Sequence, residues 1–116
     1  MTDPGPLDEM LLDLVRLIPA GSLATYGDMA AMAEELGFPC TARRAASTLR
    51  RFGSGVPWWR VVQSSGTVAE SVLAQATVLL SAEGVTVVDR RVPLGQRRWR
   101  PSPEDLLPVV DAGPAG

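Results

Sequence analysis

Two adjacent tryptophans, Trp58 and Trp59, are the residues of this sequence best suited to holding a flat aromatic ligand. They follow Pro57 and precede the run Arg60-Val61-Val62. An indole ring offers a large π face that can stack on a nucleic-acid base or bind a cationic, alkylated ring. Tryptophans are also frequent core residues, so the motif equally allows a structural role, or one ring in the core and the other beside a cavity.

A second group suited to ligand chemistry is the arginine-rich run 42–52, ARRAASTLRRF. Arg43 and Arg44 stand near its start and Arg50 and Arg51 near its end, with small side chains at 45–48 between them. Small residues allow a helix to lie close to a DNA groove, and the planar fork of arginine can donate two hydrogen bonds to a phosphate. The alternative interpretation is an exposed, charged helix.

A third segment is Thr25-Tyr26-Gly27-Asp28, where a tyrosine stands at the predicted start of a helix. Its ring or hydroxyl can point at a phosphate, or it can pack as a hydrophobic staple. Asp28 in the first turn is favourable for the helix dipole and needs no further role.

Several classes of chemistry are excluded by composition. The sequence has no histidine, which removes the commonest general base and metal ligand, and its single cysteine, Cys40, excludes an internal disulfide and a cysteine-based zinc site. We therefore expect no metal and no cofactor. A helix N-terminus can lower a thiol pKa, so an alkyl-accepting Cys40 is an alternative. Its place in a turn before the 42–52 helix, on the side expected to face the DNA backbone, favours an incidental cysteine.

Charge is segregated along the chain. The net charge is −2, but residues 1–40 carry a balance of −6 and residues 41–100 a balance of +7, and every cation is an arginine. This asymmetry predicts a face that binds a polyanion.

The elements that must position these residues are mainly helical. Apolar periodicity predicts a helix over 7–18, between Pro6 and Pro19, and a second over 27–36, led by Thr25 or Tyr26 and ended by Gly37. Thr41 is a suitable N-cap for a third helix over 42–52, which Gly53 ends. The short connection between the second and third helices is typical of a helix-turn-helix pair.

The sequence of the second half of the chain predicts the elements that complete a winged helix fold. Residues 58–62 are a short strand or a buried extended segment, 70–83 a helix ended by Gly84, and 85–89 with 90–94 the two sides of a β-ribbon, the wing. The predicted fold class is mainly α with a small β-ribbon, a winged helix-turn-helix domain over 1–108 with a flexible acidic, Pro/Gly-rich tail over 109–116. No apolar run is long enough for a membrane span and no secretion signal is visible, so we expect a cytoplasmic, nucleoid-associated protein without membrane contact.

Taken in order, three of these segments resemble a known family. The runs IPAGSLATYGDMA, ARRAASTLRR and VPWWRVVQSSGTV, within residues 7–100, are similar to the DNA-binding domain of the O6-alkylguanine-DNA alkyltransferases, and more closely to their non-catalytic relatives, the alkyltransferase-like proteins. The repair enzymes carry Pro-Cys-His-Arg-Val, in which the cysteine takes the alkyl group and the histidine helps to activate it. Here Trp58 stands at the cysteine position, as is usual in the alkyltransferase-like proteins, and Trp59 at the histidine position, which even those proteins commonly keep.

The resemblance implies a lesion pocket and no catalytic residue, because an indole cannot act as a thiolate nucleophile. In this reading Arg60 is a buried support of the pocket, Val61 and Val62 shape its wall, and a turn forms its rim. Some relatives have an arginine after this turn that contacts the modified base; Ala69-Glu70-Ser71 stands there instead. The implied pocket comprises Trp58, Trp59, Arg60, Val61, Val62, Ser64, Ser65 and Gly66.

The resemblance also assigns residues to nucleotide flipping. Tyr26 matches the tyrosine that presses on the phosphate of the target nucleotide, and Arg43 the arginine finger that fills the gap left by the flipped base, with Arg44 as the neighbouring alternative. The residues expected along the DNA backbone are Thr25, Thr41, Arg44, Ser47 and Arg50.

The sequence thus predicts a monomeric protein that binds double-stranded DNA containing an alkylated guanine, flips that base without removing the alkyl group, and flags it for nucleotide excision repair proteins. One alternative is a winged helix regulator without lesion specificity; such regulators usually dimerise on paired half-sites, and no dimer helix is evident. The third helix also offers small residues in place of Asn or Gln base readers. A further alternative is an enzyme that uses Cys40.

Overall fold

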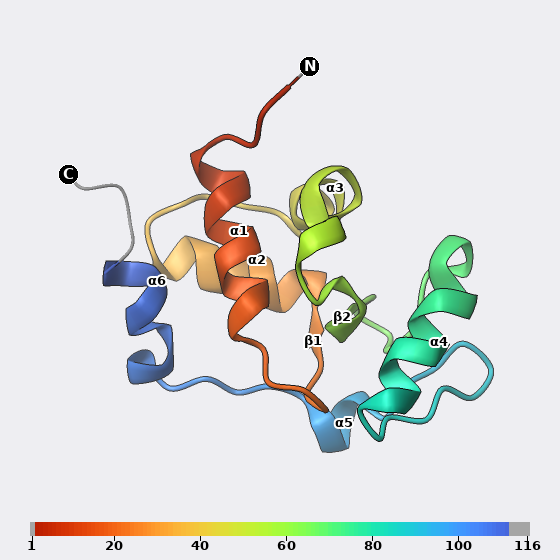
Figure 1. The fold of residues 1–116 in the computed structure, drawn as a ribbon. Helices are drawn as coiled ribbons and strands as arrows, with labels where there is room; N and C mark the ends of the chain where they lie inside the picture. The colour runs from red at the N-terminus through yellow and green to blue at the C-terminus, as the bar shows by residue number, and fades with distance from the viewer. Residues whose placement is uncertain (1, 112–116) are drawn as a thin grey trace.

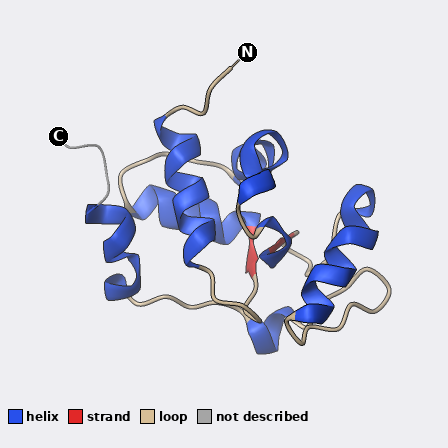
Figure 2. Ribbon diagram, viewed as in Figure 1, coloured by secondary structure: helices blue, strands red, loops and turns tan. Residues whose placement is uncertain are grey.

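The computed structural model describes residues 2–111, and helices predominate in it (Figures 1 and 2). The elements in chain order are α1 (Pro6–Leu17), β1 (Ala24–Thr25), α2 (Tyr26–Glu35), α3 (Ala42–Phe52), η1 (Gly53–Gly55), η2 (Trp58–Arg60), β2 (Val61–Val62), η3 (Glu70–Val72), α4 (Leu73–Ala82), α5 (Leu94–Arg97), η4 (Pro103–Leu106) and α6 (Leu107–Asp111). No helix among these residues is long and apolar enough to cross a membrane.

Helices α1, α2 and α3 form the first half of the molecule, as the sequence predicts. Thr25 caps α2 by accepting a hydrogen bond from the amide of Asp28 at 2.9 Å, and Thr41 caps α3 by accepting one from the amide of Arg44 at 3.1 Å. These side chains satisfy amides that have no partner inside the helix. The connection between α2 and α3 begins at Gly37, whose φ of +94° is unfavourable for any residue with a Cβ. The predicted helix-turn-helix pair is confirmed.

Two hydrophobic cores divide the chain. The first core lies among α1, α2 and α3 and is built on Leu11, Leu14, Ile18 and Met29. The second core lies beneath α4 and includes Leu80 and residues from 62–92. In Figure 1 the helix α4 stands apart from the α1–α3 group, with the short elements between them.

The small sheet joins these two halves. Strands β1 and β2 pair in parallel, with Ala24 opposite Val61 and Thr25 opposite Val62. Leu23, just before β1, pairs with the segment at the end of α5: its amide donates to the Arg97 carbonyl at 2.8 Å, and its carbonyl accepts from the Trp99 amide at 2.7 Å. The fold class predicted from the sequence, mainly helical with a small sheet in a winged helix-turn-helix arrangement, is confirmed.

The predicted β-ribbon over residues 85–94 is wrong, because the strands of the structure lie elsewhere, at 24–25 and 61–62. Residues 85–94 were expected to form a β-ribbon, but there the structure has a tight turn in which Val88 and Arg91 exchange backbone hydrogen bonds of 2.9 Å. Asp89 and Arg90 at its tip have positive φ values of 50° and 65°, as a type I′ hairpin turn requires. Beyond the turn Val92 bonds to Gly66, so the wing pairs with the 63–68 turn in place of lengthening its own ribbon.

The C-terminal segment also differs from its prediction. A flexible tail was expected from residue 109, yet α6 continues to Asp111, and Leu106 and Val109 are buried against the first core. Burial of apolar side chains against α1 accounts for this order, which composition alone does not reveal. The remainder of the predicted tail, 112–116, lies outside the described residues.

A buried aspartate fastens α3 to α1. Asp8, 6% exposed, accepts hydrogen bonds from the Thr48 hydroxyl at 2.5 Å, the Arg44 guanidinium at 3.0 Å and the Gly5 amide at 2.9 Å. Burial opposes ionisation of this carboxyl, but these donors outweigh it and hold the pKa of Asp8 below its usual value. The orientation of α3 therefore depends on a charged group that is fully partnered.

Replacing Asp8 with alanine should lower the free energy of unfolding by about 2 to 3 kcal/mol, because it leaves Thr48 and Arg44 without their acceptor. Urea denaturation measures this change. Asp13→Ala on the same helix removes an exposed ion pair with Arg16 and should cost less than about 1 kcal/mol. Equal losses in the two variants would contradict the anchoring role of Asp8.

Candidate nucleic-acid interface

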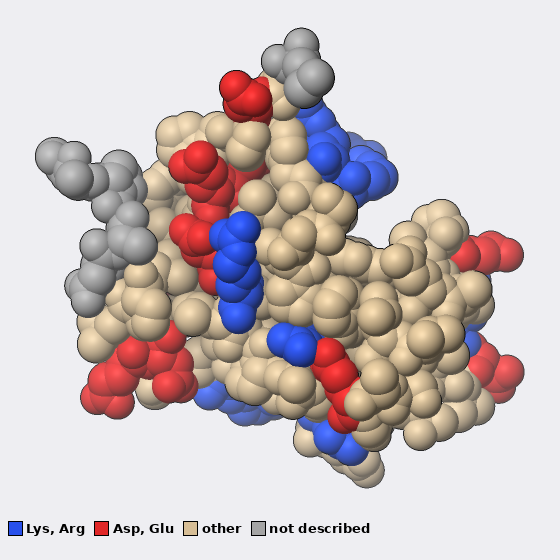
Figure 3. Space-filling model, in the orientation of Figure 1, with Lys and Arg blue, Asp and Glu red and all other residues tan. Residues whose placement is uncertain are grey.

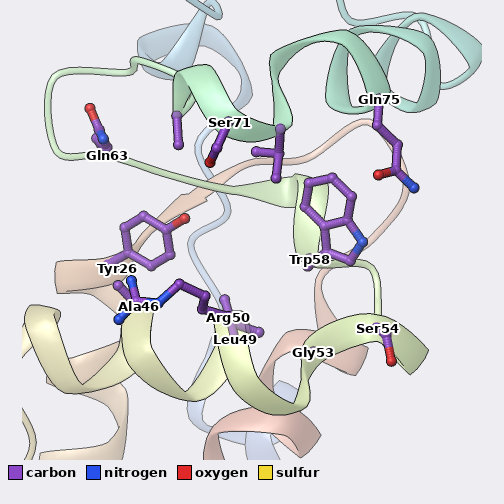
Figure 4. A pocket seen from close by; sticks show the side chains of 12 residues that line it. Tyr26, Ala46, Leu49, Arg50, Gly53, Ser54, Trp58, Gln63, Ser71 and Gln75 are labelled. Atoms are coloured by element: carbon purple, nitrogen blue, oxygen red, sulfur yellow. The ribbon is translucent and has the colours of Figure 1, made fainter.

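A cavity of about 500 Å³ opens between α3 on one side and η2, η3 and α4 on the other (Figure 4). Its size lies within the roughly 300–1,000 Å³ typical of small-molecule sites. The hollow between the α3 and α4 sides is also visible on the molecular surface (Figure 3). The lining residues are Tyr26, Ala46, Leu49, Arg50, Gly53, Ser54, Trp58, Gln63, Ala69, Ser71, Val72 and Gln75.

One face of α3 forms a wall of the cavity. Ala46, Leu49, Arg50 and Gly53 follow the helical spacing of three, four and seven residues, which places them on one side. A Cβ on Gly53 would come within 3.2 Å of the Leu49 side chain and 3.8 Å of Trp58, so a larger residue there would crowd this wall. The small residues at this end of α3 thus leave room beside Trp58.

Two aromatic rings face the cavity from opposite sides. Figure 4 shows Trp58 at one side, with Gln75 above it, and Tyr26 at the other, with Arg50 below. Burial raises the pKa of the Tyr26 phenol, although the charge of Arg50 acts in the opposite direction. The phenol is therefore a neutral hydroxyl at physiological pH and is able to donate a hydrogen bond to a phosphate or base.

The neighbouring arginines of α3 have different surroundings. Arg44 reaches Asp8 and is part of the α1–α3 fastening. Arg43 is exposed, and within residues 2–111 its side chain forms no hydrogen bond or ion pair. It lies three residues before Ala46 and seven before Arg50, so it belongs to the cavity face of α3. The structure therefore favours Arg43 over Arg44 as the residue available to a ligand.

The structure places one residue of the predicted lesion pocket in the cavity lining. All eight predicted residues are described, and of these Trp58 lines the cavity while Trp59, Arg60, Val61, Val62, Ser64, Ser65 and Gly66 do not. Val61 and Val62 are buried in strand β2, so they pack in the interior next to Trp58 and do not line the cavity. Gly66, at the end of the turn, meets the wing, where the Val92 amide donates to its carbonyl at 2.9 Å.

Arg60 is part-buried and makes contacts with both halves of the molecule. Its side chain is 15% exposed; its Nη1 donates to the Ile18 carbonyl at 2.7 Å and its Nη2 to Glu83 at 2.7 Å. Trp59 lies beside it and donates from its indole nitrogen to the same carboxylate at 2.8 Å. These two residues thus belong to a cluster behind Trp58.

The residues predicted along the DNA backbone differ in how available their side chains are, and Arg44 is already paired with Asp8. Thr25 is buried and occupied as the α2 cap, so its side chain is unavailable to a phosphate. Thr41 is exposed at the start of α3, but its hydroxyl already caps the helix. Ser47 is half-buried and Arg50 lines the cavity. Figure 3 shows basic side chains at the α3 end of the molecule and acidic ones on the α1 side, with further basic side chains along the lower edge and acidic ones on the α4 side.

Sequence reasoning did not assign five polar residues of the site. Ser54, Gln63, Ser71 and Gln75 line the cavity, and Glu83 anchors the cluster behind Trp58. Gln63 directly follows the tryptophan-arginine-valine motif and could have been included with it. Ser71 stands on η3, in the segment that the resemblance matches to a base-contacting arginine of some relatives. Gln75 and Glu83 stand on α4 and at its end, and no local pattern ties them to Trp58.

Metal-binding side chains do not gather in this region. Across residues 2–111, no group of three His, Cys, Asp or Glu side chains is placed to hold a metal ion.

Cys40 lacks the surroundings of a reactive thiol. Burial raises its pKa, and the positive charge of Arg44 does not overcome that effect. It is packed against the first core and lies outside the cavity. Iodoacetamide should therefore react with Cys40 more slowly in the folded protein than in the urea-unfolded protein at neutral pH, as followed by mass spectrometry. Faster labelling of the folded form would point to an activated thiolate.

Three comparisons place this architecture among known proteins. Residues 6–85 match the family described as 6-O-methylguanine DNA methyltransferase, DNA binding domain. A DNA base-flipping protein of Vibrio parahaemolyticus is 32% identical, across 82% of this chain and 100% of its own length. A DNA base-flipping protein of Escherichia coli is 38% identical, across 74% of this chain and 68% of its own.

A solved structure shares the fold. Atl1 of S. pombe, in complex with damaged DNA containing O6-carboxymethylguanine, superposes with a TM-score of 0.66 at 25% identity, covering 82% of this chain and 95% of that one. The helix-turn-helix pair, the small sheet and the tryptophan-arginine-valine segment all lie within the part of the sequence that the family covers. The chain belongs to the family of the 6-O-methylguanine DNA methyltransferase DNA-binding domain.

Proposed function

We propose that this protein binds double-stranded DNA and holds an alkylated guanine, flipped out of the helix, in the cavity between α3 and α4 without removing the alkyl group. The observation that carries the proposal is Trp58, an indole facing an open cavity. The sequence resemblance matches this position to the reactive cysteine of the repair enzymes. A flipped base needs such a stacking surface to offset the loss of its neighbours in the helix.

The relatives support this assignment. The proteins of V. parahaemolyticus and E. coli are base-flipping proteins by name, and the yeast structure holds damaged DNA. Base flipping requires a group that enters the duplex and one that presses on the backbone. The exposed Arg43 on the cavity face of α3 suits the first role, and Tyr26 at the cavity edge suits the second.

The side chains at the motif explain why the protein would hold an alkylated guanine without taking its alkyl group. Alkyl transfer from the guanine O6 needs a thiolate or similar nucleophile, and an indole offers none. By the sequence resemblance Trp59 takes the position of the activating histidine, but an indole nitrogen is only a donor and cannot accept a proton, and here its N–H binds Glu83. The alkyl group accordingly stays on the base.

A protein that holds a lesion without repairing it must pass it on. We infer that the persistent complex is handed to nucleotide excision repair proteins, that the protein acts as a monomer, and that it does so in the cytoplasm at the nucleoid. Co-purification of excision proteins on lesion-bearing DNA, with and without this protein, tests the handover.

The experiment that tests the central proposal compares two short duplexes, identical except for one O6-methylguanine, at a fixed salt concentration. Fluorescence anisotropy should give a lower Kd for the modified duplex. Mass spectrometry of both components afterwards should show the methyl group on the DNA and none on the protein. Transfer of the methyl group to any residue would overturn the non-catalytic part of the proposal.

Equal affinity for the two duplexes would overturn the lesion-binding part. If affinity then varied with DNA sequence, the protein would be a winged helix regulator, and selection from random duplexes would return a preferred site. This outcome leaves the family and fold unchanged, because neither depends on lesion specificity.

A further inference from the structure

The carboxylate of Glu83 is the meeting point of a cluster behind the cavity wall. It accepts hydrogen bonds from the Trp59 indole N–H at 2.8 Å, from Arg60 Nε at 3.0 Å and Nη2 at 2.7 Å, and from the Gly21 amide at 3.0 Å. The Glu83 side chain is 12% exposed and the Arg60 side chain 15%. A part-buried carboxylate with this many donors is held in one position.

The cluster connects the two halves of the molecule. Glu83 stands at the end of α4, in the second half, whereas Gly21 follows α1 in the first. Arg60 extends the connection, since its Nη1 donates to the Ile18 carbonyl at 2.7 Å. The cavity lies between these same halves, with α3 on one side and α4 on the other, so the cluster, together with the β1–β2 pairing, helps to hold its walls in place.

Trp59 transmits this constraint to the cavity. Its ring is held at its edge by Glu83, and the Arg60 guanidinium lies 5.6 Å from its ring centroid. It meets Trp58 in an edge-to-face arrangement, with centroids 5.8 Å apart and planes at 85°. The Trp58 indole N–H forms no hydrogen bond within residues 2–111, so Trp58 is held by packing alone, against Trp59 and against the second core.

We propose that Glu83 is a positioning residue: it fixes Trp59 and thereby sets the plane of Trp58 in the cavity wall. In a lesion-binding protein this plane decides how well a flipped base stacks, so its part in lesion discrimination rests on the proposed function. The positioning itself is a property of the free protein and can be tested without DNA.

The first test uses Glu83→Gln, which keeps the size of the side chain but removes its charge and replaces one acceptor oxygen with a donor. The protein is labelled with 5-fluorotryptophan, and the Trp58 signal in the ¹⁹F NMR spectrum is assigned with Trp58→Phe. We expect the Trp58 signal of Glu83→Gln to shift and broaden. Glu104→Gln, an exposed change on η4, is the matched control and should leave the signal unchanged.

A second variant removes one bond and leaves the ion pair. Trp59→Phe keeps an aromatic ring but lacks the N–H that binds Glu83, while Arg60 and Glu83 remain paired. It should also shift the Trp58 signal, and it serves as the test if Glu83→Gln does not fold. An unchanged Trp58 signal in a folded variant of either kind would overturn the positioning role.

The last measurement is binding of O6-methylguanine and plain duplexes by the same variants. We expect the ratio of the two Kd values to fall by about threefold to thirtyfold, as for other residues that act through a neighbour, while the Kd for plain DNA changes little. A parallel loss of both affinities would mean that Glu83 is merely structural. If the wild-type protein shows no preference while the NMR signal moves, the positioning role stands and the proposed function fails.

Discussion

Replacing Trp58 with alanine should weaken binding to an O6-methylguanine duplex by about tenfold to a hundredfold, because stacking of a base on an aromatic ring contributes about 1 to 3 kcal/mol. The same change should leave binding to unmodified DNA nearly unaltered. Plain DNA is held mainly through its phosphates, and Trp58 lies in the cavity wall, behind the exposed arginines of α3. Trp58→Ala should therefore lower the affinity for the modified duplex and leave the affinity for plain DNA almost unchanged.

The measurement is fluorescence anisotropy with the two duplexes at one salt concentration. Trp58→Phe is the matched control, since it keeps a smaller π face and should retain part of the preference. Thermal denaturation of each variant checks that the fold persists. If Trp58→Ala kept the full preference for the modified duplex, the lesion would have to be read elsewhere than at this wall.

Arg43→Ala should have the second large effect, on lesion binding above all. Flipping a base costs a few kcal/mol, and a side chain that fills the vacated stack offsets part of that cost. We expect the Kd for the modified duplex to rise by about tenfold to a hundredfold, far more than loss of one phosphate contact produces. The salt dependence of binding to plain DNA should change by about one unit of slope or less.

Arg44→Ala is the matched neighbour for this experiment. Arg44 pairs with Asp8 at 3.0 Å, so its removal should lower stability more than it lowers lesion discrimination. If Arg44→Ala and not Arg43→Ala abolished the preference, the finger would be Arg44, released from Asp8 on binding. A change confined to the salt slope in Arg43→Ala would reduce Arg43 to an ordinary phosphate contact.

The site combines two kinds of support that respond differently to substitution. The Asp8 cluster orients α3, and the Glu83 cluster joins the halves and holds the tryptophan pair. Loss of Asp8 should therefore act on stability, and loss of the charge at Glu83 on the shape of the cavity. The two clusters share no residue, so we expect their effects on unfolding free energy to add.

The sequence by itself determined the helical frame and the central residue of the site. The helices α1, α2 and α3 were predicted nearly to the residue, because caps such as Thr41 and stops such as Gly37 act within a few residues of the helix end. Trp58 could be placed in a pocket because its motif is contiguous and resembles a known one.

Tertiary structure decided what depends on contacts between distant segments. The strand pairing of Ala24 with Val61, the approach of Glu83 to Trp59, and the packing of Val109 against α1 each join positions that no short-range pattern relates. The same reason explains why seven of the eight predicted pocket residues stand behind the cavity or beside it. A contiguous motif gives the order of residues, whereas the turn from η2 into β2 decides which of them faces the cavity and which is buried.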